Sequence, residues 1–293
     1  MLNLLKLKNN FFTPIYKKGS TLVEPFSFYS NPINHSRCLI LLLVMGRYFI
    51  EIQYNGTNYH GWQIQENANT VQAEINKALS TFLQEEILVM GCGRTDTGVH
   101  AREFFAHFDT AKTFENDFLT YKLNCLLPKD ISCKNIFNVQ DDLHARFSAT
   151  SRTYEYWITP TKNPFLTEYA YFFPQQLNIH LMNDAAKLLI QQTDFSCFSK
   201  SNTDTLTNNC NITFAEWQKT DEKLIFTITA DRFLRNMVRA IVGTLLEIGQ
   251  EKLNKNDLQQ IIASKNRSEA GVSVPAHGLY LTKVTYPNFL EIK

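Results

Sequence analysis

Residues 47–54 of the chain read RYFIEIQY, and this stretch alternates in the way that is typical of a half-buried strand. The alternation places Tyr48, Ile50, Ile52 and Tyr54 on one face. The residues that follow predict helices over 71–83 and 115–127 and strands over 87–90, 103–108 and 131–139. The resulting order, β-α-β-β-α-β, is the split βαβ layout of ferredoxin-like domains.

The second half of the chain repeats this order of elements. Its patterns predict strands over 152–159, 212–218, 224–229 and 279–285, and helices over 179–191, 233–248 and 254–264. We therefore predict an α+β fold in which two ferredoxin-like halves, residues 46–150 and 151–293, share one long, mixed, mostly antiparallel sheet. Helices are expected on one face of that sheet and a cleft on the other.

The composition is that of a globular chain with a substantial core. It has 293 residues, 44% apolar and 19% charged. The longest apolar run, residues 39–45, is far shorter than the ~20 residues that span a bilayer, so no membrane association is expected. Six cysteines include no C-x-x-C pair, which favours free thiols in a reducing compartment over a zinc or redox site.

The first 45 residues differ from the rest and are predicted to be a dispensable extension. They carry five basic residues and one acidic residue, and they lack the features of a secretory or transit peptide. Met45 directly precedes the first patterned strand, so a chain beginning there is expected to fold and act. The whole chain has a net charge of +1, and the extension contributes 5 − 1 = +4, which leaves 1 − 4 = −3 for the body.

The loop over residues 91–101 reads GCGRTDTGVHA and is the densest polar segment of the sequence. It is not a Walker A loop, because Val99 and His100 stand where Lys and Ser or Thr are required. It is not a dinucleotide fingerprint either, because its third glycine is misplaced and a strand follows. Asp96 is left in a tight turn, where it is either a functional carboxylate or an ordinary Asx-turn residue.

Two further clusters combine positive charge with apolar or aromatic side chains. Arg232, Arg235 and Arg239 are spaced to line one strip of the helix predicted near them, either as ligands of phosphate or as a solvated edge. Residues 144–154, HARFSATSRTY, mix arginines with Phe147 and Tyr154. That mixture suits contacts to phosphates and bases, although an ordinary loop leading into a strand also explains it.

Residues 93–101, GRTDTGVHA, resemble the active-site motif of the TruA family of tRNA pseudouridine synthases. Cys92 and Thr97 stand where many members have Ala, and both are small enough for the turn. Other segments resemble the family's motifs in the family's order: 107–110 (HFDT), 123–128 (LNCLLP), 144–149 (HARFSA), 152–154 (RTY), 233–239 (FLRNMVR) and 278–281 (GLYL). The resemblance covers residues 45 to about 287, and the first 45 residues match nothing in it.

The resemblance implies two α/β halves that share a sheet, in agreement with the duplicated layout. It implies a homodimer whose basic cleft holds the anticodon stem-loop of tRNA, and the free thiols favour a cytoplasmic location. The reaction would isomerise uridine to pseudouridine at positions 38 to 40 without a metal or cofactor.

The resemblance also implies roles for individual residues. Asp96 would be the catalytic carboxylate, Arg239 its ion-pair partner, and Tyr154 a ring stacked on the target uracil. Arg94 would fill the space left by the flipped base or hold the flanking backbone, and Leu279 would wall the uracil pocket. The other expected RNA contacts are Leu143, His144, Ala145, Arg146, Phe147, Arg152, Asn202, Thr203, Asp204, Thr205, Leu206, Arg232 and Arg235.

Two other classes of protein remain as alternatives. A non-catalytic RNA-binding protein could present a basic, aromatic surface on a related sheet, but the RNP signature of such sheets is absent. A nucleoside or glycoside hydrolase would need two carboxylates that flank the scissile bond. Glu103 and Asp109 are near Asp96 in sequence, but the intervening strand is expected to separate them.

Overall fold

β1 (Gly46–Tyr54) begins the first of two similar halves in the computed structural model, which describes residues 45–200 and 206–287. These residues belong to one compact unit, residues 43–293. The first half continues with α1 (Val71–Leu83), β2 (Met90–Gly91), β3 (His100–Thr110), α2 (Asn116–Leu126) and β4 (Ile131–Val139). The second half comprises β5 (Ser151–Thr159), β6 (Tyr171–Phe172), α3 (Ile179–Leu189), β7 (Ile212–Lys219), β8 (Leu224–Ala230), α4 (Met237–Gly249), α5 (Lys255–Ser264) and β9 (Leu279–Thr285).

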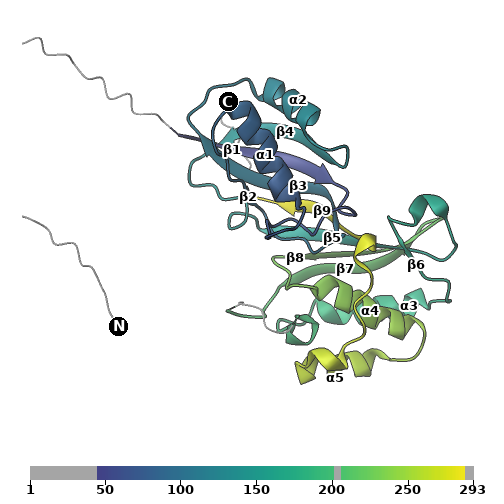
Figure 1. Cartoon of the computed structure of the whole chain (residues 1–293). Coiled ribbons are helices and arrows are strands. Elements are labelled where there is room, and N and C mark those ends of the chain that lie inside the picture. The colour runs from purple at the N-terminus through teal and green to yellow at the C-terminus, as the bar shows by residue number, and fades with distance from the viewer. Residues whose placement is uncertain (1–44, 201–205, 288–293) are drawn as a thin grey trace, which may run out of the picture. The chain divides into compact units, whose positions relative to one another are not determined.

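The described strands form a nine-stranded sheet whose main path is β4-β1-β3-β9-β5-β8-β7, with β2 beside β3 and β6 beside β5 (Figure 1). The strands of the first half lie in the order β4-β1-β3-β2, and those of the second half, without the short β6, lie in the order β9-β5-β8-β7. Numbered along the chain within each half, both orders are 4-1-3-2. The ferredoxin-like order is therefore present twice. The β3–β9 and β5–β6 pairs are parallel and the other pairs are antiparallel. The predicted fold class is confirmed.

The two halves meet where β9 pairs with β3. In the described residues this pairing consists of His100 with Tyr280 and Ala101 with Leu281. β2 occupies the same edge of β3 further along, opposite Ala106 and His107. Because β2 is only two residues long, the start of β3 stays free to accept β9. Figure 1 shows the yellow β9 between the strands of the two halves.

The strand predicted over residues 87–90 is shortened to β2 (Met90–Gly91), because side chains of α1 form hydrogen bonds with the backbone groups that precede it. The Ile87 N–H donates to Ser80 Oγ (2.8 Å), and the Val89 N–H donates to Asn76 Oδ1 (3.0 Å). The Val89 carbonyl accepts a bond from Gln72 Nε2 (2.8 Å). These backbone groups are therefore satisfied without a neighbouring strand.

The helix predicted over residues 233–248 begins later, at Met237. Asn236 has a φ of 66°, a left-handed conformation that cannot continue a helix backwards. Its side chain is held by a hydrogen bond to Ser273 Oγ (2.6 Å), and the Arg235 carbonyl accepts a bond from the Lys200 N–H (3.1 Å). The prediction that Arg232, Arg235 and Arg239 share one helical strip is therefore wrong, since only Arg239 is helical.

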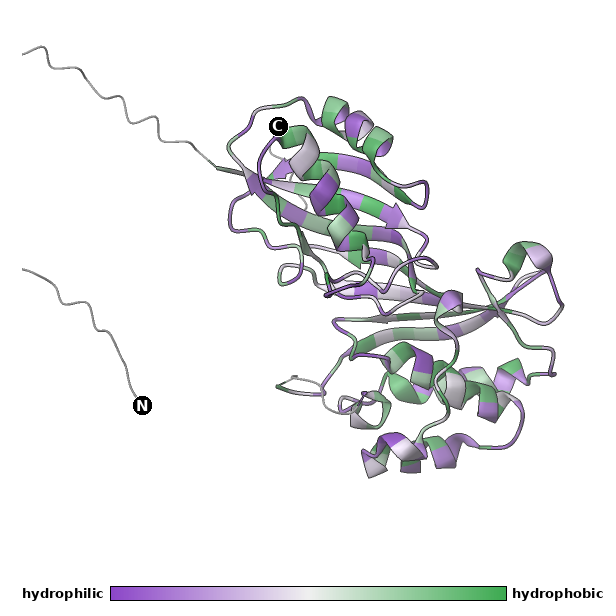
Figure 2. Ribbon diagram, in the orientation of Figure 1, coloured by the Kyte–Doolittle hydropathy of each residue, from purple (hydrophilic) through white to green (hydrophobic). Residues whose placement is uncertain are grey.

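The core has two parts, one centred on each half, with Leu281 and Val284 of β9 in the first part and Val99 in the second. α1 buries Val71, Ile75, Leu79 and Leu83, at a spacing of four, in the first part. α3 and α4 contribute to the second part, together with β5, β7 and β8. Apolar residues recur along the strands and helices of both halves (Figure 2).

The cleft lies on the same face of the sheet as the helices, which differs from the prediction. Tyr156 on β5 is paired with Phe226 on β8 and with Leu279 on β9, and directly paired residues point to the same face. Tyr156 and Phe226 are fully buried in the core that α3 and α4 cover, whereas Leu279 lines the cleft. The cleft is thus the gap that two groups of helices leave over one continuous sheet.

Candidate active site

The Asp96 loop, residues 92–99, connects β2 to β3 and ends one residue before the β3–β9 pairing. Its turn closes through the Val99 N–H, which donates to the Asp96 carbonyl (3.1 Å). A buried hydrogen bond between Thr95 Oγ1 and the Tyr54 hydroxyl (2.9 Å) anchors the loop to β1. Within the described residues the Asp96 carboxylate makes no hydrogen bond to backbone, so the Asx-turn explanation is not supported.

The segment over residues 56–62 supports the Asp96 loop by direct contact between backbones. Gly61 has a φ of +90°, and a Cβ there would lie 2.3 Å from the Thr95 carbonyl oxygen. A Cβ on Gly56 would lie 2.0 Å from the Val99 carbonyl oxygen. Only glycine allows this approach at either position. The two glycines therefore determine how closely the backbone of the Asp96 loop packs against the segment over residues 56–62.

Two guanidinium groups flank the Asp96 carboxylate, one at each oxygen. Arg235 Nε lies 3.7 Å from Oδ1, and Arg239 Nη1 lies 3.9 Å from Oδ2. Arg239 is held in place by a hydrogen bond from its Nε to the Val274 carbonyl (2.7 Å). The structure thus joins Asp96 of the first half to Arg239 of the second, as predicted, and adds Arg235.

Tyr154 on β5 forms part of the floor of the cleft. It is paired with Leu281 on β9, and its ring meets Phe233 edge-on at 5.1 Å between centroids. Burial raises the pKa of its hydroxyl well above the ordinary range, and the nearby Cys92 and Asp96 raise it further. Tyr154 is therefore protonated at neutral pH, where it can donate a hydrogen bond but cannot act as a phenolate base.

The cleft around these residues has a volume of about 1540 Å³. Its lining includes eight cationic side chains and one carboxylate, that of Asp96. The predicted residues found in the lining are Arg94, Asp96, Arg146, Phe147, Arg152, Tyr154, Leu206, Arg232, Arg235, Arg239 and Leu279. Burial lowers the pKa of Arg146, and the positive charges of Arg94, Arg152 and Arg232 lower it further. These guanidinium groups are therefore close enough to repel Arg146.

Some predicted contacts lie elsewhere, and some lining residues were not predicted. Leu143, His144 and Ala145 are not among the residues that line the cleft, and Asn202, Thr203, Asp204 and Thr205 lie outside the described residues. The lining also includes five polar or charged residues that were not predicted: His60, Gln63, Gln65, Lys200 and Arg267. The closely spaced Gly56 and Gly61 could have indicated that the segment over residues 60–65 packs closely against another part of the chain. Lys200 and Arg267 are isolated cations that belong to no motif.

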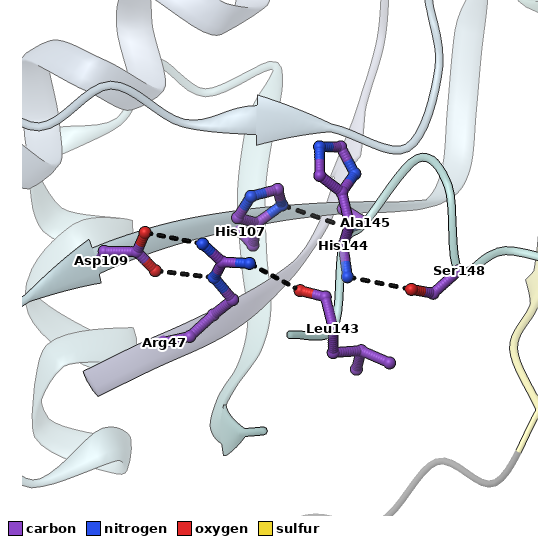
Figure 3. Close-up of polar contacts among 7 residues, drawn as sticks. All are labelled: Arg47, His107, Asp109, Leu143, His144, Ala145 and Ser148. Carbon is purple, nitrogen blue, oxygen red and sulfur yellow. Dashed lines mark hydrogen bonds and ion pairs between the residues drawn. The ribbon is translucent and has the colours of Figure 1, made fainter. Parts of the chain in front are cut away.

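Polar contacts hold the segment 143–148, which leads to Arg146 and Phe147, against the sheet (Figure 3). Arg47 binds Asp109 through Nε (2.7 Å) and Nη2 (2.8 Å), and its Nη1 donates to the Leu143 carbonyl (3.1 Å). The Ala145 N–H donates to Nδ1 of His107 (3.2 Å). Nδ1 of His107 is therefore unprotonated. Burial lowers the pKa of this imidazole to about 4, together with the charges of Arg47 and His144.

Glu103 and Asp109 do not form a carboxylate pair with Asp96. Glu103 Oε1 accepts the Val284 N–H (2.7 Å), Asp109 is bound by Arg47, and neither lines the cleft. The two-carboxylate geometry of a hydrolase is therefore missing from the described residues. No cluster of three or more His, Cys, Asp or Glu side chains that could hold a metal occurs in that part of the chain.

Comparisons with known proteins identify the family of this chain. A family model described as tRNA pseudouridine synthase matches residues 185–287, a range that includes the end of α3 and all of β7, β8, α4, α5 and β9. The tRNA pseudouridine synthase A of Parabacteroides distasonis is 50% identical over 247 residues, covering 84% of this chain and 98% of the relative. The enzymes of that name from Bacteroides fragilis (51% over 243 residues; 82% and 96%) and Clostridium acetobutylicum (40% over 239 residues; 81% and 98%) are also similar.

This chain belongs to the tRNA pseudouridine synthase A (TruA) family, whose members isomerise uridine to pseudouridine in tRNA. It is therefore an isomerase and not a non-catalytic RNA-binding protein.

The low pKa of His107 predicts a pH-dependent contribution to stability. In the unfolded chain the imidazole takes up a proton near its ordinary pKa of 6.5, but in the folded protein it does so only at about 4. The unfolded state therefore holds more protons between these values. The contribution is complete above about pH 6.5 and is lost as the pH falls to about 4, by up to about 1.4 kcal/mol per pH unit.

The variant His107→Gln keeps an acceptor for the Ala145 N–H but does not titrate. Urea unfolding of both proteins should be measured from pH 4 to 8. The difference between their free energies of unfolding should be constant at high pH, and below about pH 6.5 the wild type should lose stability relative to the variant. A difference that stays constant over the whole range would contradict the assignment.

Proposed function

We propose that this enzyme modifies uridines at positions 38 to 40, in the anticodon stem-loop of tRNA, and that Asp96 is its catalytic carboxylate. The observation that carries the proposal is the charge of the cleft, where eight cations surround one carboxylate. Such a surface favours a ligand rich in phosphates. The cleft also exceeds the ~300–1,000 Å³ of a small-molecule site, which suits a folded RNA segment better than a free nucleoside.

The target uridine has to leave the helical stack before it can react. Flipping a base out of its stack costs a few kcal/mol, which contacts between the cleft and the RNA backbone must offset. Arg94 is exposed on the Asp96 loop, where it can fill the vacated space or hold the flanking backbone. Leu279 and Leu281 lie beside Tyr154 and provide an apolar wall for the uracil.

The isomerisation breaks the bond between N1 and C1′ and forms a bond between C5 and C1′. N1 gains a proton and C5 loses one, so the uracil keeps its composition and no oxidant or reductant is consumed. Asp96 acts on the sugar or the base of the flipped nucleotide, oriented by Arg235 and Arg239. Tyr154 stacks on the ring, and its hydroxyl, which is protonated, assists through a hydrogen bond while the C5 proton passes to water. We expect no cofactor, because each of these steps uses only protein side chains and water.

The wider context of the enzyme follows from its substrate. We place it in the cytoplasm, where tRNA is modified, and as a homodimer, as the family resemblance implies. No helix of the described residues is long and apolar enough to cross a membrane. The expected extension, residues 1–45, lies outside the described residues apart from Met45.

The role of Asp96 is tested by tritium release from tRNA that carries tritium at C5 of its uridines. Asp96→Asn should lower the rate by about 10²–10⁴-fold, because the variant keeps the shape of the carboxylate but loses its charge. Its affinity for tRNA should change little, because phosphate contacts supply most of the binding. The same tRNA with cytidine at positions 38 to 40 should release no tritium.

Asp221→Asn, in the exposed turn between β7 and β8, is the matched control and should behave as the wild type. A wild-type rate for Asp96→Asn would refute the catalytic role of this residue. Tritium release from the cytidine-substituted tRNA would refute the proposed positions, and free uracil among the products would indicate hydrolysis.

The proposed dimer is tested by sedimentation velocity at the protein concentration of the assay. The sedimenting species should have twice the 33.9 kDa mass of one chain. A fully active species of 33.9 kDa would rule out a requirement for the dimer.

A further inference from the structure

Arg152, near the start of β5, places its guanidinium among four backbone carbonyls. Nη1 donates to the carbonyls of Ala149 (3.0 Å) and Asp231 (2.8 Å). Nη2 donates to the carbonyls of Cys92 (3.1 Å) and Arg146 (2.6 Å). Both terminal nitrogens are thus fully used within the protein, since each carries two N–H groups.

These carbonyls belong to three segments that line the cleft. Cys92 begins the Asp96 loop, and the segment that includes Arg146 and Ala149 forms another wall. Both belong to the first half of the chain. Asp231 begins the loop over residues 231–236, which belongs to the second half and carries Arg232 and Arg235. A single planar group therefore ties together segments of both halves around Asp96.

The neighbouring cations differ from Arg152 in this respect. Among the described residues, the side chains of Arg94, Arg146 and Arg232 make no hydrogen bond to protein. They remain available for phosphate, and they repel one another, as the lowered pKa of Arg146 indicates. Holding them together without RNA requires a rigid support, and the carbonyls around Arg152 supply compensating negative dipoles.

We propose that Arg152 is a positioning residue that holds the Asp96 loop and the 231–236 loop at the spacing that the reaction requires. This role replaces the phosphate contact expected from the sequence, and it rests on the proposed function of Asp96. The planar fork of an arginine can reach four carbonyls at once. A lysine has three donors on one atom and cannot bridge the same set.

The test combines three measurements on Arg152→Lys and Arg152→Gln: thermal unfolding, the salt dependence of tRNA affinity, and the single-turnover rate at saturating tRNA. We expect both variants to be folded at the assay temperature. The single-turnover rate should fall by about 10- to 100-fold, because a displacement of about 1 Å can cost about 10²-fold. The slope of log K against log [salt] should match the wild type, because no phosphate contact is lost.

Two further variants calibrate these measurements. Arg232→Ala removes a proposed phosphate contact and should lower the salt slope by about 0.7–0.9. Arg102→Ala removes an exposed arginine that lies over Trp157 outside the cleft, and it should change neither the slope nor the rate. Amide hydrogen exchange should be faster in both the 92–99 and the 231–236 segments of the Arg152 variants and unchanged in Arg102→Ala.

Each competing role of Arg152 gives a different result. A salt slope lowered by about 0.7–0.9 with an unchanged single-turnover rate would show a phosphate contact and overturn the proposal. Reduced thermal stability with an unchanged rate would show a purely structural role and also overturn it. Failure of the Asp96 assignment would appear separately, as full activity of Asp96→Asn, and would leave the Arg152 measurements interpretable.

Discussion

The parallel pairing of β3 with β9 is the constraint on which the rest of the site depends. It brings the end of the Asp96 loop beside Leu281, and Tyr154 lies one strand further along the same sheet. Asp96 comes from the first half of the chain, whereas Tyr154 and Arg239 come from the second. Neither half can therefore build the site alone. The pairing in turn depends on the shortness of β2, which leaves the start of β3 open.

The charge distribution explains how a nearly neutral chain can bind a polyanion. Among the described residues, eight cations and one anion line the cleft, a net of 8 − 1 = +7, whereas the body as a whole is at −3. The rest of the body therefore carries a net negative charge. Binding of a polyanion therefore depends on where the cations lie and not on the net charge of the chain. Ion pairs with Asp96 hold Arg235 and Arg239, and backbone carbonyls hold Arg152.

The regular elements and the motif residues could be predicted from the sequence, but the contacts between remote segments could not. The strand over 47–54 and the order of elements follow from periodicity, and Asp96, Tyr154 and Arg239 follow from motifs. The late start of α4 depends on the left-handed Asn236, which Ser273 holds from far along the chain. The acceptors of Arg152 are backbone carbonyls, which no sequence pattern marks. The cleft lies on the face of the sheet that the helices cover, and the order of elements along the chain does not determine on which face a cleft forms.

The most direct test of this account is photocrosslinking with tRNA that carries 4-thiouridine at one target position. We expect crosslinks to peptides that contain Asp96, Tyr154 or Leu279, on strands and loops of both halves. Competition with unmodified tRNA should abolish them. Crosslinks confined to one half, or to the helix-free face of the sheet around Trp157, would contradict a site built at the junction of β3 and β9.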